Sequence, residues 1–412
     1  MTLGNRLGQL DFLRGLALFG VIVVHTSQDF DSAIYPFSYM LGQWDPYHLG
    51  RYGVQLFFAI SGFTMVMMYQ SYIAKWQSPV KVFYVKRILR LYPLLVIAAF
   101  AYLLVDLRAD ARFNPDGVQV MDFVRLLTFT GGWDPLYLNV LVPGVWSIIN
   151  EIYFYMLFPL LFFAIGRVSP WIIGIVLAVL NIGLVVGADV LYQPSAAFLA
   201  GGAERAADHA WLVKDFMYRN FLVSLLCFYA GMESYRFLHG GSKDFIGLAV
   251  PLLVAGIAME VVERQSGGAI TSEILKVTAL ACLFYGLIIL SFRPAIAGLF
   301  QNATIEKFGT VTYTGYIIHF AIIHVAALAA REAGVMDYAK FEWVLPVIVV
   351  ATALISYGIQ RWTETVWQDA ANAICKALFS RKDKAVSSDA TVKGYKGPKI
   401  ADQLGEAEPG QL

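Results

Sequence analysis

Long apolar stretches alternate with short polar ones along most of the chain. Ten stretches of roughly 20 residues can be marked, at 10–27, 53–70, 88–105, 144–165, 170–191, 216–235, 245–262, 274–292, 308–330 and 343–361. About 20 consecutive apolar residues in a helix cross the hydrocarbon core of a bilayer. The pattern therefore predicts an all-α fold, a polytopic membrane helix bundle of about ten transmembrane helices.

The composition agrees with this prediction and argues against several other classes of protein. Of the 412 residues, 58% are hydrophobic and only 15% are charged, whereas soluble domains carry about 25% charged residues. The net charge of +1 and the lack of a basic stripe give no reason to expect a nucleic acid partner. The three cysteines are isolated in sequence, so neither a disulfide framework nor a metal site is expected.

The charges in the connecting loops predict how the bundle lies in the membrane. The connection 71–87 holds Lys75, Lys81, Lys86 and Arg87 and no acidic residue, whereas 28–52 holds three aspartates against one arginine. Lysine and arginine favour cytoplasmic loops, so both termini are expected in the cytoplasm. We expect one transmembrane domain over residues 1–380. Because 381–412 is polar and poor in aromatic residues, we expect a disordered cytoplasmic tail there.

The first apolar segment carries two side chains that are costly inside lipid, Arg14 and His25. They are eleven residues apart, which is about 16 Å along a helix axis. His25 is a candidate general base, because imidazole titrates near neutral pH. The alternative is structural: Asp11 and Arg14 form an i,i+3 ion pair at one membrane edge, and His25 caps the other edge.

A second group of cations opens the third apolar segment. Arg87 and Arg90 are one turn apart on one helix face, and Lys86 precedes them. Two guanidinium groups in that arrangement can bind phosphate through paired hydrogen bonds. Anchoring to lipid headgroups explains the same pattern, and Lys86 fits that alternative well.

Glu151 lies about two turns inside the fourth apolar segment, where a carboxylate needs a partner. Because this segment runs from the outside inward, we expect Glu151 in the outer third of the membrane, at a depth similar to that of His25. A carboxylate that orients an imidazole is a recurring catalytic arrangement. The alternative is a structural hydrogen bond to another helix.

Further polar and aromatic side chains are candidates for lining a pore or an acceptor site. They are Asp11, Ser61, Trp146, Tyr313, Tyr316 and His319. Tyr316 and His319 share a helix face, and together with Tyr313 they are candidates for stabilising an oxyanion. No spacing of histidine and acidic residues predicts a metal site.

Several of these residues fall in motifs that resemble those of the acyltransferase type 3 family of membrane acyltransferases. The motifs are Leu10-Asp11-Phe12-Leu13-Arg14-Gly15 through His25, Gly53 to Phe63 with Ser61-Gly62, Lys86-Arg87-x-x-Arg90-x-Tyr92-Pro93, Trp146-Ser147 through Glu151 to Pro159, Tyr313 through Tyr316 to His319, and a weak closing element from Tyr357 to Glu364. They follow one another in the family's order over about residues 10 to 365. Gln55 departs from the pattern, since an aspartate is common at its position.

The resemblance implies transfer of an acyl group, usually acetyl, from cytoplasmic acyl-CoA to a hydroxyl of an extracytoplasmic or lipid-linked polysaccharide. It implies a multi-pass protein of the bacterial inner membrane. Its expected partners are acyl-CoA (acetyl-CoA as the acyl donor, without a metal), a glycan or lipid-linked sugar, and membrane lipids. It also implies that Arg14 and His25 matter for activity and that Arg87 and Arg90 hold the acyl donor.

The residues and the resemblance together lead to one hypothesis about mechanism. We expect the nucleotide head of CoA to dock on Arg14, Lys86, Arg87 and Arg90, while its pantetheine arm threads the bundle to His25. There His25, oriented by Glu151, would deprotonate the acceptor hydroxyl. Two other classes stay open. A transporter or flippase for an envelope saccharide precursor would use the same buried charges as a pathway, and a non-catalytic scaffold would leave them without a role.

Overall fold

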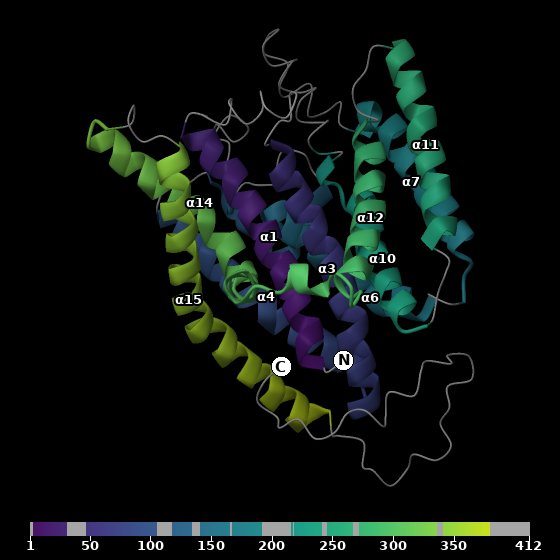
Figure 1. Cartoon of the computed structure of the whole chain (residues 1–412), viewed down its shortest axis with the longest axis horizontal. Helices are drawn as coiled ribbons and strands as arrows, with labels where there is room; N and C mark the ends of the chain where they lie inside the picture. The colour runs from purple at the N-terminus through teal and green to yellow at the C-terminus, as the bar shows by residue number, and fades with distance from the viewer. Residues whose placement is uncertain are drawn as a thin grey trace.

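The computed structural model describes residues 3–30, 47–104, 118–133, 141–164, 167–191, 216, 218–240, 245–266, 272–335 and 341–379. These residues are almost entirely helical and contain no β-strand, so the predicted all-α fold class is confirmed. The long helices gather in one bundle (Figure 1). The predicted tail, 381–412, and much of the predicted outer loops lie outside the described residues.

Each of the ten predicted apolar segments coincides with a helix. These helices are α1 (Leu3–Asp29), α3 (Tyr47–Lys75), α4 (Pro79–Leu104), α6 (Val145–Ala164), α7 (Pro170–Leu191), α10 (Phe221–Leu238), α11 (Phe245–Ser266), α12 (Ser272–Ser291), α14 (Thr312–Glu332) and α15 (Phe341–Leu378). The connections hold the short helices α5 (Val120–Thr128) and α13 (Ala303–Thr310) and the 3-10 turns η1 (Thr130–Trp133) and η3 (Ala297–Phe300). The last helix, α15, has 38 residues and continues well past its predicted end at residue 361.

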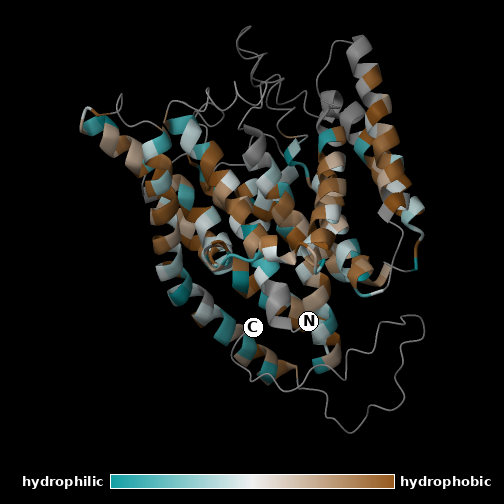
Figure 2. Cartoon of the chain, in the orientation of Figure 1, coloured by the Kyte–Doolittle hydropathy of each residue, from teal (hydrophilic) through white to brown (hydrophobic). Residues whose placement is uncertain are grey.

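Within the described ranges, five helices are long and apolar enough, by length and composition, to cross a membrane. Their spans are Gly8–Asp29, Tyr52–Lys75, Val145–Ala164, Thr312–Glu332 and Phe341–Leu378. Apolar residues dominate α7, α11 and the upper half of α15 (Figure 2), where Val179, Val254 and Leu354 are exposed. The protein is therefore a multi-pass membrane protein, whereas the count of ten spans and the cytoplasmic termini stay predictions.

Helix α1 lies inside the bundle (Figure 1). It packs against α3, α13, α14 and α15, and its residues Leu10, Leu18 and Ile22 are fully buried. On the other side of α3 come α10 and then α12, whereas α7 and α11 pair at the edge of the bundle. The side chains of α1, α3 and α10 are therefore mostly buried, and most of the predicted site residues stand on α1 and α3 or on the helices that touch them.

Glycine residues bring the central helices into backbone contact, as small residues do in many membrane proteins. A Cβ atom at Gly309 of α13 would lie 1.7 Å from the carbonyl oxygen of Asp11. One at Gly231 of α10 would lie 1.7 Å from the carbonyl oxygen of Ala59. No side chain fits at such distances, so α13 is held against α1 beside Arg14, and α10 is held against α3.

We predict that Gly231→Ala separates α10 from α3 and lowers the free energy of unfolding by about 1–3 kcal/mol, as overpacking typically does. The matched control is Gly286→Ala, because a Cβ at Gly286 of α12 meets no atom within 4 Å. Thermal unfolding of both purified variants in the same detergent measures the difference. Equal unfolding temperatures would contradict the proposed close contact.

Candidate functional site

Polar side chains inside the bundle gather in two clusters. The arginine cluster, nearer the end of the bundle where α1 begins, consists of Asp11, Arg14, Ser61, Arg87, Arg90, Glu151 and Tyr155. The histidine cluster, toward the opposite end, consists of His25, Trp146, Ser147, Arg219, Tyr316, His319 and Phe320. Helix α1 carries members of both clusters, so the helix rise sets their separation.

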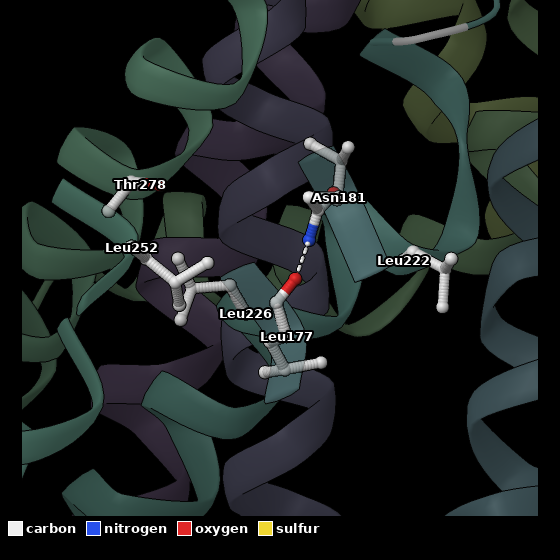
Figure 3. Close-up of a pocket in the computed structure, with 7 residues that line it drawn as sticks. Leu177, Asn181, Leu222, Leu226, Leu252 and Thr278 are labelled. Atoms are coloured by element: carbon white, nitrogen blue, oxygen red, sulfur yellow. Dashed lines mark hydrogen bonds between the residues drawn. The ribbon is translucent and has the colours of Figure 1, made fainter. Parts of the chain in front are cut away.

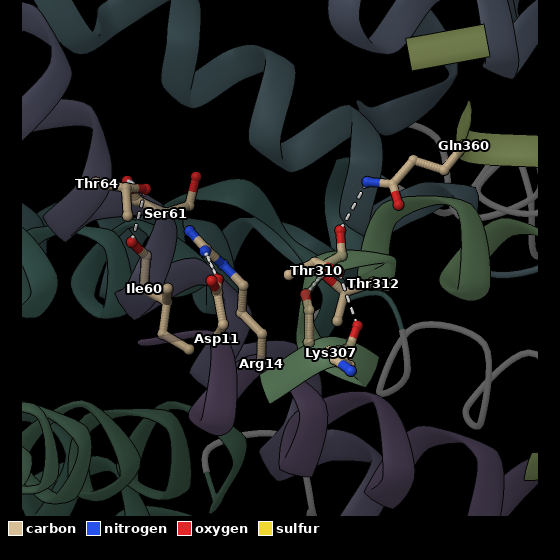
Figure 4. Close-up of polar contacts among 10 residues, drawn as sticks. Asp11, Arg14, Ile60, Ser61, Thr64, Lys307, Thr310, Thr312 and Gln360 are labelled. Carbon is tan, nitrogen blue, oxygen red and sulfur yellow. Dashed lines mark hydrogen bonds and ion pairs between the residues drawn. The ribbon is translucent and has the colours of Figure 1, made fainter. Parts of the chain in front are cut away.

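In the arginine cluster, α1 places Asp11 and Arg14 one turn apart. The Nη1 atom of Arg14 donates to Oδ1 of Asp11 at 2.5 Å, which is the i,i+3 ion pair of the structural alternative. In Figure 4 the guanidinium group reaches toward Ser61 and Thr64 of α3. Arg14 also interacts electrostatically with Arg90 and Glu151, so the ion pair belongs to a larger charged group formed by α1, α4 and α6.

Glu151 lies in the arginine cluster and not beside His25. Ser61 donates its hydroxyl hydrogen to Oε1 of Glu151 at 2.9 Å, and the hydroxyl of Tyr155 donates to the same oxygen. The predicted pairing of Glu151 with His25 is therefore wrong. The reason is that α6 turns the carboxylate toward Ser61 of α3. Ser61 is one turn further along α3 than Phe57, whose ring contacts Tyr316 of the histidine cluster.

Arg87 is a buried cation whose hydrogen bonds are incomplete. Its side chain is 4% exposed, Nη2 donates to Sδ of Met68 at 3.0 Å, and the guanidinium group lies 5.8 Å from the Tyr155 ring. A thioether is a weak acceptor. Within the described part of the chain, Nε and Nη1 of Arg87 and Nε of Arg90 are buried without a hydrogen-bond partner. Buried donors without partners are costly, and an anion would satisfy them.

Lys86 faces a different environment from the two arginines. Its Nζ atom lies 5.2 Å from the ring centre of Tyr72 and 5.9 Å from that of Trp76. Cation–π contacts of this kind hold an ammonium group over an aromatic face. Lys86 is therefore next to the arginine pair in sequence but is held by the end of α3.

In the histidine cluster, α14 brings a second imidazole to His25. The two ring centres are 5.3 Å apart, and the Phe320 ring lies 4.2 Å from each of them. Nδ1 of His25 is 3.0 Å from Oε1 of Gln28. Gln28 is thus the hydrogen-bond partner of His25, the role that the sequence-based hypothesis gave to Glu151.

His319 has one ring nitrogen bonded and one without a partner. Nδ1 lies 2.7 Å from the carbonyl oxygen of Tyr316. A carbonyl oxygen only accepts hydrogen bonds, so Nδ1 carries the proton and, in the neutral ring, Nε2 carries the lone pair. Nε2 is buried and has no hydrogen-bond partner among the described residues. His319 therefore presents a ring nitrogen with an unshared lone pair beside His25.

The two tyrosines expected to stabilise an oxyanion are engaged in the fold. The hydroxyl of Tyr316 donates to the carbonyl oxygen of Gly144 at 3.1 Å and accepts from Ser147 at 2.8 Å. The hydroxyl of Tyr313 donates to the carbonyl oxygen of Leu91 at 2.5 Å. Each phenol has one hydrogen to donate, and both hydrogens are used in these bonds. The bonds join α14 to the start of α6 and to α4.

Arg219 is a member of the histidine cluster that sequence reasoning did not select. Its guanidinium group lies 5.6 Å from the ring centre of Trp146 and interacts electrostatically with His25 and Tyr316. Its carbonyl oxygen accepts a hydrogen bond from Nδ2 of Asn150 at 2.7 Å. An arginine in an apolar segment was the available signal, since such residues commonly mark functional pathways.

Two polar features lie apart from both clusters. A small cavity between α7, α10, α11 and α12 is lined mainly by leucines, and its polar side chains are Thr278 and Asn181, which donates to the carbonyl oxygen of Leu177 (Figure 3). On α10, Nη1 of Arg236 lies 2.5 Å from Oε1 of Glu233, which is 1% exposed. This pair resembles Asp11–Arg14 in geometry but contacts neither cluster.

A family model described as an acyltransferase domain matches residues 7–361. The matched range contains every residue of the two clusters and ends within α15. No curated protein and no solved structure matches the chain.

The two buried arginines, Arg87 and Arg236, should respond differently to the same substitution. We predict that Arg87→Met changes the free energy of unfolding by less than about 1 kcal/mol, because Nε and Nη1 lack partners and Nη2 donates only to a thioether. Arg236→Met should cost about 3–5 kcal/mol, because it leaves the Glu233 carboxylate buried without its cation. Thermal unfolding in detergent measures both. A larger loss for Arg87→Met than for Arg236→Met would contradict the assignment of Arg87 as a cation awaiting an anion.

Proposed function

The chain belongs to the acyltransferase type 3 family, and we propose that it transfers an acetyl group from acyl-CoA to a saccharide hydroxyl. In this proposal acetyl-CoA binds at the arginine cluster on the cytoplasmic side of a bacterial inner membrane. The acceptor, an extracytoplasmic or lipid-linked polysaccharide, binds at the histidine cluster. The proposal starts from the membrane location of the chain and from its family. The two clusters provide the side chains that would bind the donor and the acceptor.

The observation that carries the proposal is the set of unpartnered guanidinium donors at Arg87 and Arg90. Coenzyme A has a polyanionic head, and phosphate oxygens accept paired hydrogen bonds from guanidinium groups. Asp11 and Glu151 offset part of the positive charge in the cluster, which limits the cost of keeping three arginines together. A bound phosphate group would satisfy the remaining N–H groups.

The geometry of α1 supports a transfer between the two clusters. Arg14 and His25 are about 16 Å apart along one helix, and an extended pantetheine arm reaches over a comparable distance. The phosphates and the thioester of one CoA molecule can therefore engage opposite ends of the same helix. Acyl transfer would then occur at His25 while the nucleotide stays at the arginine cluster.

At the histidine cluster, we assign the role of general base to His25. Nδ1 of its ring faces Gln28, so Nε2 is the nitrogen that accepts the proton of the acceptor hydroxyl. The resulting oxygen attacks the thioester carbon, the carbon–sulfur bond breaks, and the CoA thiolate takes up a proton. Arg219 supplies positive charge near His25 for the oxygen that becomes negative during the attack, and Glu151 adds negative charge near Arg14.

We predict that His25→Gln lowers the rate of acetyl transfer by about 10²–10⁴-fold, the usual contribution of a general base. The measurement is thiol release from acetyl-CoA by purified protein in proteoliposomes, with an extract of bacterial envelope saccharides as the acceptor. Binding of CoA to His25→Gln should stay unchanged and serves as the control for folding. Wild-type turnover by the variant would refute the role of His25. Movement of saccharide without thiol release would favour the transporter or flippase.

The arginine cluster leads to a separate prediction for binding of the acyl donor. Arg90→Gln should raise KM for acetyl-CoA at least tenfold with little change in kcat, because a phosphate contact forms before and during the reaction alike. S-acetylpantetheine, which has no phosphate, should be used equally by the variant and the wild type. An equal rise in KM for both acyl donors would show that Arg90 supports the fold and does not contact phosphate.

A further inference from the structure

Helix α15 extends beyond the membrane-spanning bundle at the arginine end. Its 38 residues correspond to about 57 Å, whereas a bilayer core is about 30 Å thick. Figure 1 shows its lower half curving beneath the bundle. The family match ends at residue 361, so most of this lower half lies outside the part of the chain that the family shares.

The lower half of α15 is attached to the body of the protein at two places. At the first, Nε2 of Gln360 donates to the carbonyl oxygen of Thr310 at the end of α13, at 2.9 Å (Figure 4). At the second, Ala371 and Cys375 are buried, and Cys375 interacts electrostatically with Lys86 of α4. Nearby, Nζ of Lys81 lies 5.9 Å from the Phe379 ring centre.

Between the two attachments, α15 covers the body loosely. Ser356 and Ala371 are buried, but no side chain described between them is. The second attachment holds this stretch against α4, on which Arg90 stands one turn beyond Lys86 and is partly exposed. The loosely covered stretch thus runs from Thr310, next to the Gly309 that touches Asp11, to Lys86, one turn before Arg90, and both ends border the arginine cluster.

Two tryptophans in this stretch lie on different faces of α15. Trp362 and Trp367 are five residues apart, which places them roughly 140° apart around the helix. Trp362 is 82% exposed and Trp367 is 37% exposed. Trp367 is four residues from the buried Ala371 and so shares its face. Trp367 is therefore turned toward the protein, yet more than a third of its surface is uncovered.

We propose that Trp367 is the stacking surface for the adenine ring of acyl-CoA. This inference rests on the proposed function and adds the place where the base of the acyl donor binds. The phosphates would occupy the arginine cluster on α4, and the nucleoside would extend outward to α15, two turns before Cys375. Indole faces stack on purines without needing hydrogen bonds to the base, so one aromatic side chain and a neighbouring cation suffice for a nucleotide.

Binding of two truncated forms of the acyl donor tests the inference. The protein is reconstituted in nanodiscs, and its affinity is measured by titration calorimetry for CoA and for 4′-phosphopantetheine, which lacks the adenosine and two of the three phosphates. Trp367→Leu should weaken CoA binding roughly tenfold, the effect expected when one base loses its stacking partner. Its affinity for 4′-phosphopantetheine should equal that of the wild type, and Trp367→Phe should restore most of the affinity for CoA.

Trp362→Leu is the matched control and should bind both ligands as the wild type does. The inference is overturned if Trp367→Leu binds CoA normally, or if it loses affinity for both ligands equally, which would mean a structural role. If the wild-type protein binds neither ligand, the proposed function itself fails. Arg90→Gln, which should lose affinity for both ligands, separates the phosphate contact from the stacking contact.

Discussion

Helix α1 carries Arg14 near one end and His25 near the other, and no break in the helix separates them. The rise of one continuous helix therefore fixes how far the two polar clusters lie apart. Contacts at glycine hold α1 against α3 and α13, so its neighbours cannot change that distance by shifting. The position of the remaining groups follows from which helices reach α1 and at what depth.

Buried charged side chains in the bundle have two kinds of surroundings. Asp11–Arg14 and Glu233–Arg236 are ion pairs between residues one turn apart, which is how a charge persists in a medium of low dielectric constant. Arg87 has aromatic and sulfur neighbours in place of a carboxylate. A buried cation without an anion is unfavourable, and in the proposed function a phosphate of acyl-CoA would offset this cost. The contrast separates a group that stabilises the fold from one suited to binding.

Periodicity and apolar length predicted the helices, and residue spacing predicted the Asp11–Arg14 pair, because both depend on neighbours in sequence. The partners of Glu151 and His25 depend on how each helix is rotated about its axis, which depth alone does not define. Glu151 consequently bonds to Ser61, and His25 to Gln28. The engaged hydroxyls of Tyr313 and Tyr316 escaped prediction for another reason: their acceptors are backbone carbonyls of distant segments, and every residue has such a group.

The hydroxyl of Tyr316 joins α14 to Gly144 and Ser147 at the start of α6. Glycine contacts hold α1 against α3 and α13, whereas side-chain hydrogen bonds join α14 to the start of α6. Each such hydrogen bond contributes only about 0.5–1.5 kcal/mol, so we expect the contact between α6 and α14 to open more readily than the glycine contacts. This contact lies beside the imidazole pair.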